Sequence, residues 1–244
     1  MKFKAVDAVS IASILRTVGE FMPEVTLVST KEGLRLGGVD PSRVAYVDIV
    51  IPSLYFQEFE SGEREVIGIK LEDVINALKN VKKNDGLTFF TNEGKLELTI
   101  EGDFERSFII PLVELEEPKN PGINLQFAFK AKMLTSTFNE TLDILSDMGE
   151  SVVISSEDGK LIISVEGDVG VSRVELSEAA GNLIEASGTN ASSVYGLDYL
   201  LKTTKMRNSS DVVELMFGTQ LPLKLRFQLP QEGYGDVYIA PRAE

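Results

Sequence analysis

The sequence predicts an α+β fold assembled from four similar units, each about a quarter of the 244-residue chain. Two observations predict it. Four segments with the apolar spacing of helices recur at nearly equal intervals, and a hairpin-like pattern of alternating residues follows each of them. A chain that repeats one helix and one set of strands four times is therefore expected to mix helices with antiparallel sheets.

The first two helical segments place apolar residues at positions i, i+3, i+4 and i+7, which lie on one face of a helix; the fourth follows this spacing with Thr204 at its last position. The apolar stripes begin at Ile11, Leu71, Leu134 and Leu197, so successive starts are 60, 63 and 63 residues apart. The third stripe is the loosest. We expect the four helices, each facing a core, within residues 10–22, 70–83, 130–148 and 196–207.

The hairpin signals are strongest in residues 88–103 and 153–168. Both segments carry Gly-Lys-Leu at the turn and Glu-Gly-Asp at the strand end. Residues 25–40 and 213–229 are more distant versions. The glycines expected to supply the positive φ that tight hairpins require are Gly33, Gly94, Gly159 and Gly218.

The stretch from Glu114 to Gly122 separates the four units into two pairs. It is acidic, contains two prolines and has no periodicity, which favours an extended connector. A long surface loop explains the same residues equally well. We expect an N-terminal domain over residues 1–113, a connector over residues 114–125 and a C-terminal domain over residues 126–244.

The composition excludes most catalytic chemistry. The chain has no Cys and no His, which removes disulfides, thiolate metal sites and every histidine-based catalytic arrangement. Acidic runs such as Glu114, Glu116 and Glu117, or Asp143 and Asp147, have no glycine-rich phosphate loop or metal-spaced companions beside them. We therefore expect a protein that is not an enzyme, with no catalytic residue, no metal and no cofactor.

No targeting or membrane segment is apparent. The first ten residues contain no apolar signal core, and no apolar run approaches the roughly 18 residues needed to cross a bilayer. The expected location is cytoplasmic.

Charge is distributed unevenly along the chain. The formal net charge is −14, yet the four helical segments together carry +3, which leaves −17 elsewhere. If the polar faces of the helices met on one surface, that surface could contact phosphates without reading bases. The alternative is that these are ordinary solvated helix faces. The third segment fits the first explanation poorly, because Glu140 and Asp143 project outward from it.

Five stretches carry a resemblance to a known family. They are Leu36–Val44, Ile67–Val74, the connector, Leu221–Leu225 and Tyr238–Arg242. None is decisive alone, but their order and spacing are specific and extend over the whole chain. On these residues the chain resembles proliferating cell nuclear antigen, the DNA sliding clamp of archaea and eukaryotes. It is most similar to the subunits of crenarchaeal clamps, some of which assemble as heterotrimers.

The resemblance implies the DNA clamp fold: two similar domains, each of two βαβββ units, with helices on the pore face and antiparallel sheets on the outer face. It implies a ring of three subunits, identical or mixed, that encircles duplex DNA at the nucleoid through weak, sequence-independent contacts. Such a ring acts as a processivity factor and docking platform. The implied partners bind through short peptide motifs and are a DNA polymerase, a clamp loader, a ligase and a flap nuclease. A checkpoint-type clamp or a non-DNA interaction scaffold with the same fold is the alternative.

The resemblance also implies which residues face DNA. Lys79 and Lys205 fall where family members carry Lys. The third helix departs from the family pattern, because Thr137 and Glu140 stand near positions where many clamps have Arg. The full DNA-facing set is Arg16, Lys79, Lys82, Lys83, Lys132, Lys202, Lys205 and Arg207.

Two further sites follow from the resemblance. The partner-peptide pocket would comprise Val39, Arg43, Tyr46, Ile123, Pro222, Tyr238, Ile239, Ala240 and Pro241. Arg43 replaces the His found in some relatives. Subunits would associate head to tail by pairing the edge segments 105–110 and 170–176, through Phe108, Ile109, Ile110, Val171, Arg173 and Val174.

Overall fold

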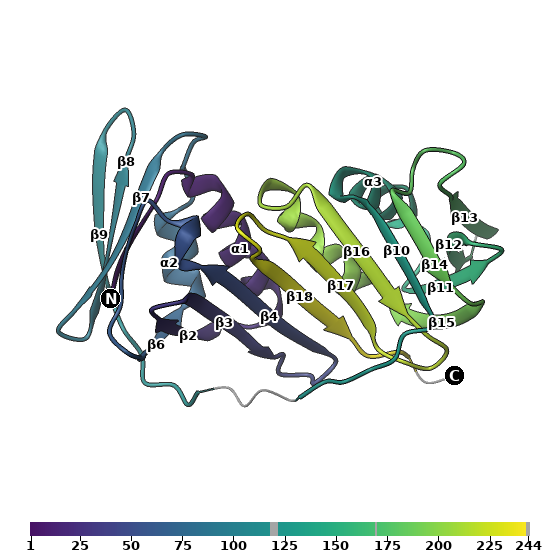
Figure 1. The fold of residues 1–244 in the computed structure, drawn as a ribbon, viewed down its shortest axis with the longest axis horizontal. Helices are drawn as coiled ribbons and strands as arrows, with labels where there is room; N and C mark the ends of the chain where they lie inside the picture. The colour runs from purple at the N-terminus through teal and green to yellow at the C-terminus, as the bar shows by residue number, and fades with distance from the viewer. Residues whose placement is uncertain (118–121, 169, 243–244) are drawn as a thin grey trace. The chain divides into compact units, whose positions relative to one another are not determined.

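The computed structural model describes residues 1–117, 122–168 and 170–242 (Figure 1). These residues divide into two compact units. The first unit holds residues 1–43, 47–117 and 229–235, and the second holds residues 44–46, 122–168, 170–228 and 236–242. Two short segments therefore belong to the unit from which they are distant in sequence. The domain limits at residues 113 and 126 stay predictions, and residues 118–121 of the predicted connector lie outside the described residues.

The first unit is built of strands, two α-helices and one 3₁₀ turn. Their bounds are β1 (Lys2–Ala5), α1 (Ala8–Phe21), β2 (Glu24–Thr30), β3 (Gly33–Val39), β4 (Ala45–Pro52), η1 (Ser53–Tyr55), β5 (Glu58–Glu60), β6 (Glu65–Lys70), α2 (Leu71–Ala77), β7 (Gly86–Asn92), β8 (Lys95–Glu101) and β9 (Glu105–Pro111). One sheet has the order β5-β1-β7-β8-β9, and a second run of strands has the order β4-β3-β2-β6.

The second unit repeats this plan. Its bounds are β10 (Phe129–Leu134), α3 (Thr135–Leu145), β11 (Ser151–Glu157), β12 (Lys160–Gly167), β13 (Gly170–Leu176), β14 (Glu185–Gly188), β15 (Ala191–Gly196), α4 (Leu197–Leu201), η2 (Lys202–Asn208), β16 (Val212–Phe217), β17 (Leu223–Gln228) and β18 (Tyr234–Ile239). The strand orders are β14-β10-β16-β17-β18 and β13-β12-β11-β15.

The predicted fourfold repeat is confirmed. The described elements form four βαβββ modules: β1-α1-β2-β3-β4, β6-α2-β7-β8-β9, β10-α3-β11-β12-β13 and β15-α4-β16-β17-β18, with β5 and β14 as additions. Within each unit the modules exchange their first strands, since β1 pairs with β7, β6 with β2, β10 with β16 and β15 with β11. This exchange joins the two modules of a unit by main-chain hydrogen bonds, so neither module is a separate domain.

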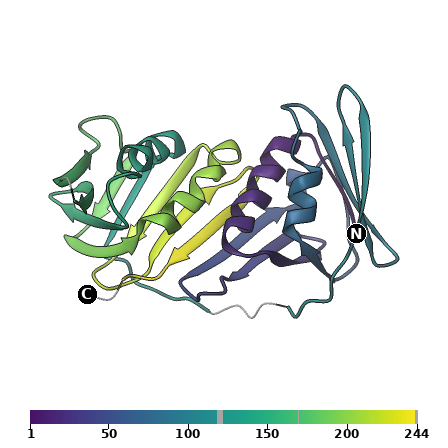
Figure 2. The ribbon, with the colours of Figure 1, turned by 180° about the vertical axis from the view of Figure 1, so that it is seen from behind.

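The helices lie against the sheets (Figure 2), and the residues that the four helices bury are mostly apolar. Asp7 starts α1 by accepting from the main-chain N–H groups of Val9 and Ser10. Helices α1 and α2 approach closely at Gly19, where a Cβ atom would lie 2.7 Å from Cδ1 of Ile75. Helix α2 contacts β2, β6 and β9, and α3 contacts β10, β12 and β16, so each of these helices packs on both sheets of its unit.

Turn chemistry follows the sequence at two hairpins. Glu93 and Gly94 have φ of 47° and 75°, and Asp158 and Gly159 have φ of 49° and 77°. Two consecutive positive φ values define the tight turn that matches the twist of a two-residue hairpin. The expectation for Gly218 is wrong, because the positive φ in the loop between β16 and β17 belongs to Gln220, at 56°.

Three helices differ from their predicted limits. Helix α2 ends at Ala77 rather than near residue 83, and the fourth helix is α-helical only to Leu201 before it tightens into the 3₁₀ segment η2. Helix α3 begins at Thr135, not at residue 130. Residues 129–134 form β10 instead, because alternate side chains are buried there, which is the period of a strand and not of a helix.

Candidate nucleic-acid interface and partner sites

Three predicted DNA-facing lysines follow the C-terminal end of α2. Lys79, Lys82 and Lys83 are all exposed. Nζ of Lys82 donates to Asp103 at 2.6 Å, and this hydrogen bond raises the pKa of Lys82. Lys79 and Lys83 make no ion pair within the part of the chain that the structure describes. Cations at a helix C-terminus are favoured by the helix dipole, and these two remain free to meet an anion.

Arg16 has a structural contact as well as a predicted DNA contact. It lies on α1, and its Nη2 donates to the main-chain oxygen of Leu78 at 2.9 Å. That oxygen is one of the carbonyls that the last turn of α2 leaves without a helical partner. Arg16 therefore joins α1 to the end of α2, and its half-buried guanidinium is fixed in place.

The second unit carries its predicted cations on η2. Nζ of Lys202 lies 4.2 Å from the ring centroid of Tyr199, a cation–π distance. Lys205 and Arg207 are exposed on the same segment. The structure thus brings the three η2 cations together in the second unit and the α2 lysines together in the first.

Lys132 does not join the η2 cations, and its placement on the third helix is wrong. It lies on β10, where its buried neighbours Ala131 and Met133 point toward the helices, so Lys132 points to the opposite face of the sheet. There it stands opposite Glu185 on β14 and Glu214 on β16.

Cross-strand neighbours of Lys132 on this face of the sheet form a row of side chains with alternating charge. Glu214 stands opposite Arg226 on β17, and Arg226 donates to both oxygens of Asp236 on β18 at 2.7 and 2.6 Å. Asp236 is only 3% exposed and also pairs with Lys224 at 2.9 Å. Cross-strand pairs of opposite charge stabilise a sheet. Lys132 is therefore accounted for as one member of a structural charge row.

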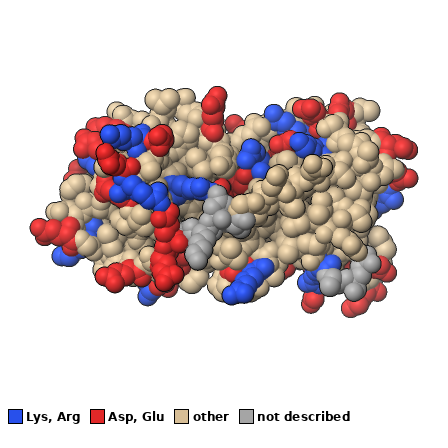
Figure 3. All heavy atoms as spheres, turned by 60° about the horizontal axis from the view of Figure 1, so that its bottom comes forward, with Lys and Arg blue, Asp and Glu red and all other residues tan. Residues whose placement is uncertain are grey.

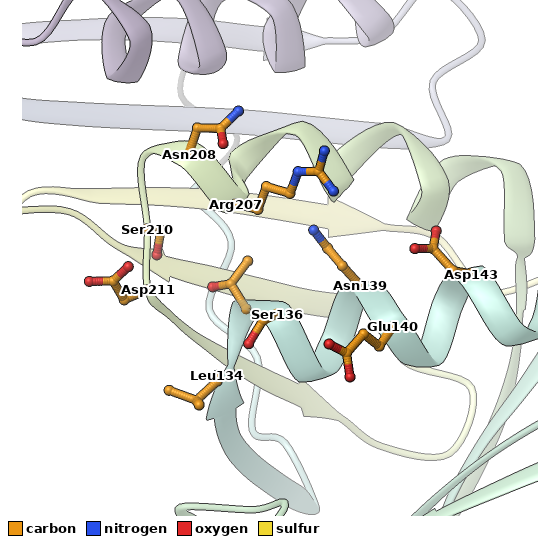
Figure 4. Close-up of a pocket in the computed structure, with 10 residues that line it drawn as sticks. Leu134, Ser136, Asn139, Glu140, Asp143, Arg207, Asn208, Ser210 and Asp211 are labelled. Carbon is orange, nitrogen blue, oxygen red and sulfur yellow. The ribbon is translucent and has the colours of Figure 1, made fainter. Parts of the chain in front are cut away.

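Helix α3 presents acids where a DNA-facing helix would carry cations. Glu140 and Asp143 are exposed, and α3 contains no Lys or Arg. Asn139 joins α3 to η2 by donating from Nδ2 to the main-chain oxygen of Thr204 at 2.9 Å. A cavity of about 580 Å³ lies beside this contact and is lined by Leu134 of β10 and by residues of α3, of η2 and of the loop that follows η2 (Figure 4).

Several residues of the predicted partner-peptide pocket belong to the second unit, and the pocket itself stays a prediction. The rings of Tyr46 and Tyr238 lie 5.9 Å apart, and Nζ of Lys224 lies 5.1 Å from the Tyr238 ring. Ile123, Pro222, Ala240 and Pro241 are half-buried, whereas the Ile239 side chain is fully buried and can offer only its main chain. The N–H of Ala240 already donates to the oxygen of Val44 at 2.8 Å. Val39 and Arg43 belong to the first unit, and their share in the pocket stays a prediction.

Sequence analysis missed a cavity beside the C-terminal segment of the second unit. It measures about 460 Å³ and is lined by Ser192, Ser193, Val194, Thr219, Gln220, Pro241 and Arg242. Of these residues only Pro241 was predicted for the pocket. The lining comes from β15, from the loop before β17 and from the end of the chain, so no local sequence signal could have gathered it.

The two predicted subunit-contact segments are edge strands. β9 and β13 each end the strand order of their sheet. Ile109 and Val171 are 67% and 66% exposed, and Phe104 beside β9 is 79% exposed although the sequence did not single it out. Ile110 is buried in the core of its unit and can contribute only main-chain groups. Exposed apolar edges of this kind are hazards unless another strand covers them.

Acidic and basic side chains are interspersed around a broad uncharged area on the face drawn in Figure 3. Among the described residues no helix is long and apolar enough to cross a membrane. Within those same residues, no three His, Cys, Asp or Glu side chains are grouped so as to hold a metal ion.

Comparison with known proteins assigns the chain to a class. Residues 1–109 match the family model for the N-terminal domain of proliferating cell nuclear antigen, and residues 123–242 match the model for its C-terminal domain. The chain therefore belongs to the proliferating cell nuclear antigen family and is a sliding-clamp subunit.

Individual relatives narrow the assignment. The chain is 55% identical to DNA polymerase sliding clamp 2 of Saccharolobus solfataricus over 245 residues, with all of both chains covered. It is 33% identical to the DNA polymerase sliding clamp of Thermofilum pendens, again over both full lengths.

Among solved structures, a PCNA2–PCNA3 complex from Sulfolobus tokodaii contains a chain with a TM-score of 0.96 and 48% identity, with both chains fully covered. PCNA from Thermococcus kodakaraensis follows with a TM-score of 0.93, 26% identity and 99% of each chain covered. The expected clamp fold is thereby confirmed, and the likeness to crenarchaeal clamp subunits with it.

Proposed function

We propose that this chain is one of three subunits of a closed ring that encircles duplex DNA and retains a DNA polymerase on it. The observation that carries the proposal is the pair of cationic segments at matching places in the two units, Lys79 after α2 and Lys205 on η2. Lys79 comes eight residues after Leu71, the first residue of α2, and Lys205 comes eight residues after Leu197, the first residue of α4. A ring held on DNA by topology needs only such weak contacts, because it cannot dissociate sideways.

The DNA contact in this proposal uses the cations that the structure gathers, all of them exposed except the half-buried Lys202. In the first unit these are Lys79 and Lys83, with Lys82 held partly by Asp103. In the second unit they are Lys202, Lys205 and Arg207. Lys132 is left out, since it lies on the face of its sheet turned away from the helices.

Closure of the ring would use β9 of one subunit and β13 of the next. Both strands are edges with exposed apolar residues, and antiparallel pairing would satisfy their free main-chain groups. This is a heterologous contact, which forms a closed ring when the rotation between subunits permits it. The similarity to a chain from a PCNA2–PCNA3 complex supports partners that are sister clamp subunits; a ring of identical chains is the alternative arrangement.

The remaining roles are docking roles and require no chemistry from the chain. We propose that it is non-catalytic and works at the nucleoid, and that clamp loader, ligase and flap nuclease bind through short peptides beside Tyr46, Tyr238 and Pro241. The half-buried aromatic pair supports an apolar peptide site there. The checkpoint-type clamp and the scaffold without DNA have no observation in their favour.

Primer extension on circular and linear templates tests the proposal. The chain, with its sister subunits, a clamp loader and a polymerase, should lengthen products on a singly primed circle. On a linear template the gain should vanish, because a ring slides off open ends, and it should return when both ends are blocked. Equal stimulation on open linear and circular templates would contradict an encircling ring.

A further inference from the structure

The two units hold their helix pairs together in different ways. In the first unit Arg16 of α1 donates to the main-chain oxygen of Leu78, the eighth residue counted from the start of α2. In the second unit Asn139 of α3 donates to Thr204, the eighth residue counted from the start of α4. The same carbonyl is thus satisfied in both units, by a long cation in one and by a short neutral amide in the other.

Because Asn139 replaces a cation in this role, the charge beside the helix pair of the second unit differs from that in the first unit. Arg16 is the ninth residue of α1, and the ninth residue of α3 is Asp143. The second unit therefore has a carboxylate where the first has a guanidinium. Glu140 lies one turn before Asp143 on the same exposed side of α3.

Arg207 is the one cation among the residues that line the cavity beside these acids. It lines the same cavity as Asn139, Glu140 and Asp143, and Asp211 is the third carboxylate around that cavity. Figure 4 shows its side chain extending from η2 over Asn139 toward the side of Asp143. Arg207 is exposed and makes no ion pair among the residues that the structure describes. Its long side chain can turn either to these carboxylates or outward to solvent.

We infer that Glu140 and Asp143 compete with DNA phosphates for the guanidinium of Arg207, which makes them positioning residues that weaken the DNA contact of the second unit. The inference rests on the proposed function and names the groups that tune it. A carboxylate and a phosphate offer a guanidinium the same planar pair of acceptors, so one can replace the other. Of the lysines that follow α2 in the first unit, Lys82 faces Asp103 and Asp85, whereas Lys79 and Lys83 make no ion pair among the described residues.

Salt dependence of duplex binding tests the inference. The assembled ring would be titrated with a fluorescent 30-base-pair duplex, and anisotropy would give the affinity between 50 and 200 mM salt. The variant Glu140→Gln/Asp143→Asn should gain one phosphate contact through the released Arg207. One phosphate contact steepens the salt slope, the slope of the logarithm of the binding constant against the logarithm of the salt concentration, by about 0.9. The loss of affinity between 50 and 200 mM salt should therefore grow about 3.5-fold.

A double-mutant cycle separates competition from general repulsion. In an Arg207→Gln background the same pair of substitutions should leave the slope unchanged. A matched control is Glu157→Gln/Glu166→Gln, which removes two acids from strand positions on the sheet face opposite the core. This control should not alter the slope in either background, and equal thermal midpoints would confirm that all variants fold.

Two results would overturn the inference while leaving the proposed function in place. The first is an unchanged slope in Glu140→Gln/Asp143→Asn, and the second is an equal gain when Arg207 is absent. If the parent ring shows no salt-dependent binding, and Lys79→Gln/Lys83→Gln has no effect, the proposed function itself fails and this inference fails with it.

Discussion

Truncation of Ile109 to Ala on the exposed edge of β9 should weaken association between subunits. Ile109 is 67% exposed in the single chain, and complete burial of an isoleucine is worth about 1.5–3 kcal/mol. Covering the exposed two-thirds in an interface is therefore worth about 1–2 kcal/mol. At 1.4 kcal/mol per tenfold change, the dissociation constant should rise by about 5- to 30-fold.

Ile144 provides a matched control for that substitution. It is 62% exposed but lies on α3, so it belongs to neither edge strand. Sedimentation velocity would measure association of each variant with the parent chain and with sister clamp subunits across a concentration series. Ile144→Ala should associate as the parent does. An Ile109→Ala variant that associates normally, or equal weakening by both substitutions, would refute the assignment of β9 as a subunit edge.

Three further predictions concern stability within each unit, measured by denaturant unfolding. Asp236→Ala should lose about 3 kcal/mol, because Lys224, whose side chain is 12% exposed, would be left buried without its carboxylate, whereas Arg226, 37% exposed, can still reach water; a loss under about 1 kcal/mol would contradict this. Tyr195→Phe should lose about 1–2 kcal/mol at pH 8, since the hydroxyl donates to Leu221 at 2.8 Å. Burial raises the pKa of Tyr195, so this contribution is complete below the ordinary tyrosine pKa of about 10 and is lost as pH rises through the raised value. The difference from the parent should accordingly shrink by pH 11. Gly37→Ala should lose at least about 2 kcal/mol, because φ is +142° and a Cβ atom would meet a neighbouring main-chain oxygen. Gly94→Ala, with φ of +75° and open space around it, should lose only about 1 kcal/mol.

Much of the fold could be predicted from local sequence signals. Gly94 and Gly159 each sit at the second position of a two-residue turn, and the alternating strands on both sides fixed the register around them. Equal spacing of the helical stripes predicted the module count. Both signals act over fewer than twenty residues, which is why they are readable without tertiary information.

The errors arose where two periods overlap. The spacing of Leu134, Phe138, Leu142 and Leu145 predicts one helical stripe, which places Lys132 on the same helix. In the structure Leu134 ends a strand and Phe138 begins the helix core, so the helical period applies only from residue 135 onward. The strand period of Phe129, Ala131 and Met133 was the signal that could have corrected it.

The candidate sites were harder to predict because their parts come from distant segments. The cavity beside Pro241 joins Ser193 of β15, Thr219 of a loop and Arg242 near the end of the chain. Its shape depends on which strands pair within the unit, and the periodicity of the sequence does not indicate strand pairing. The resemblance to a family located Pro241 but not the polar side chains around it.

Equivalent positions in the two units show which features both units share and which differ between them. The main-chain oxygens of Leu78 and Thr204 must both be satisfied, and both are, although by different side chains. Lys79 and Lys205 each come directly after those residues and are cations in both units, as the dipole of the preceding helix favours. The first helices of the two units do not share a cation in this way, since the ninth residue is Arg16 in α1 and Asp143 in α3. The positive charge offered to an anion thus belongs to the second helix of each unit, and the first helix is the part free to diverge. On the proposed function, the acidic side chains of α3 would weaken the DNA contact of the second unit without altering the fold. The helix pair needs no cation at the position of Asp143, because Asn139 makes the hydrogen bond that joins the two helices.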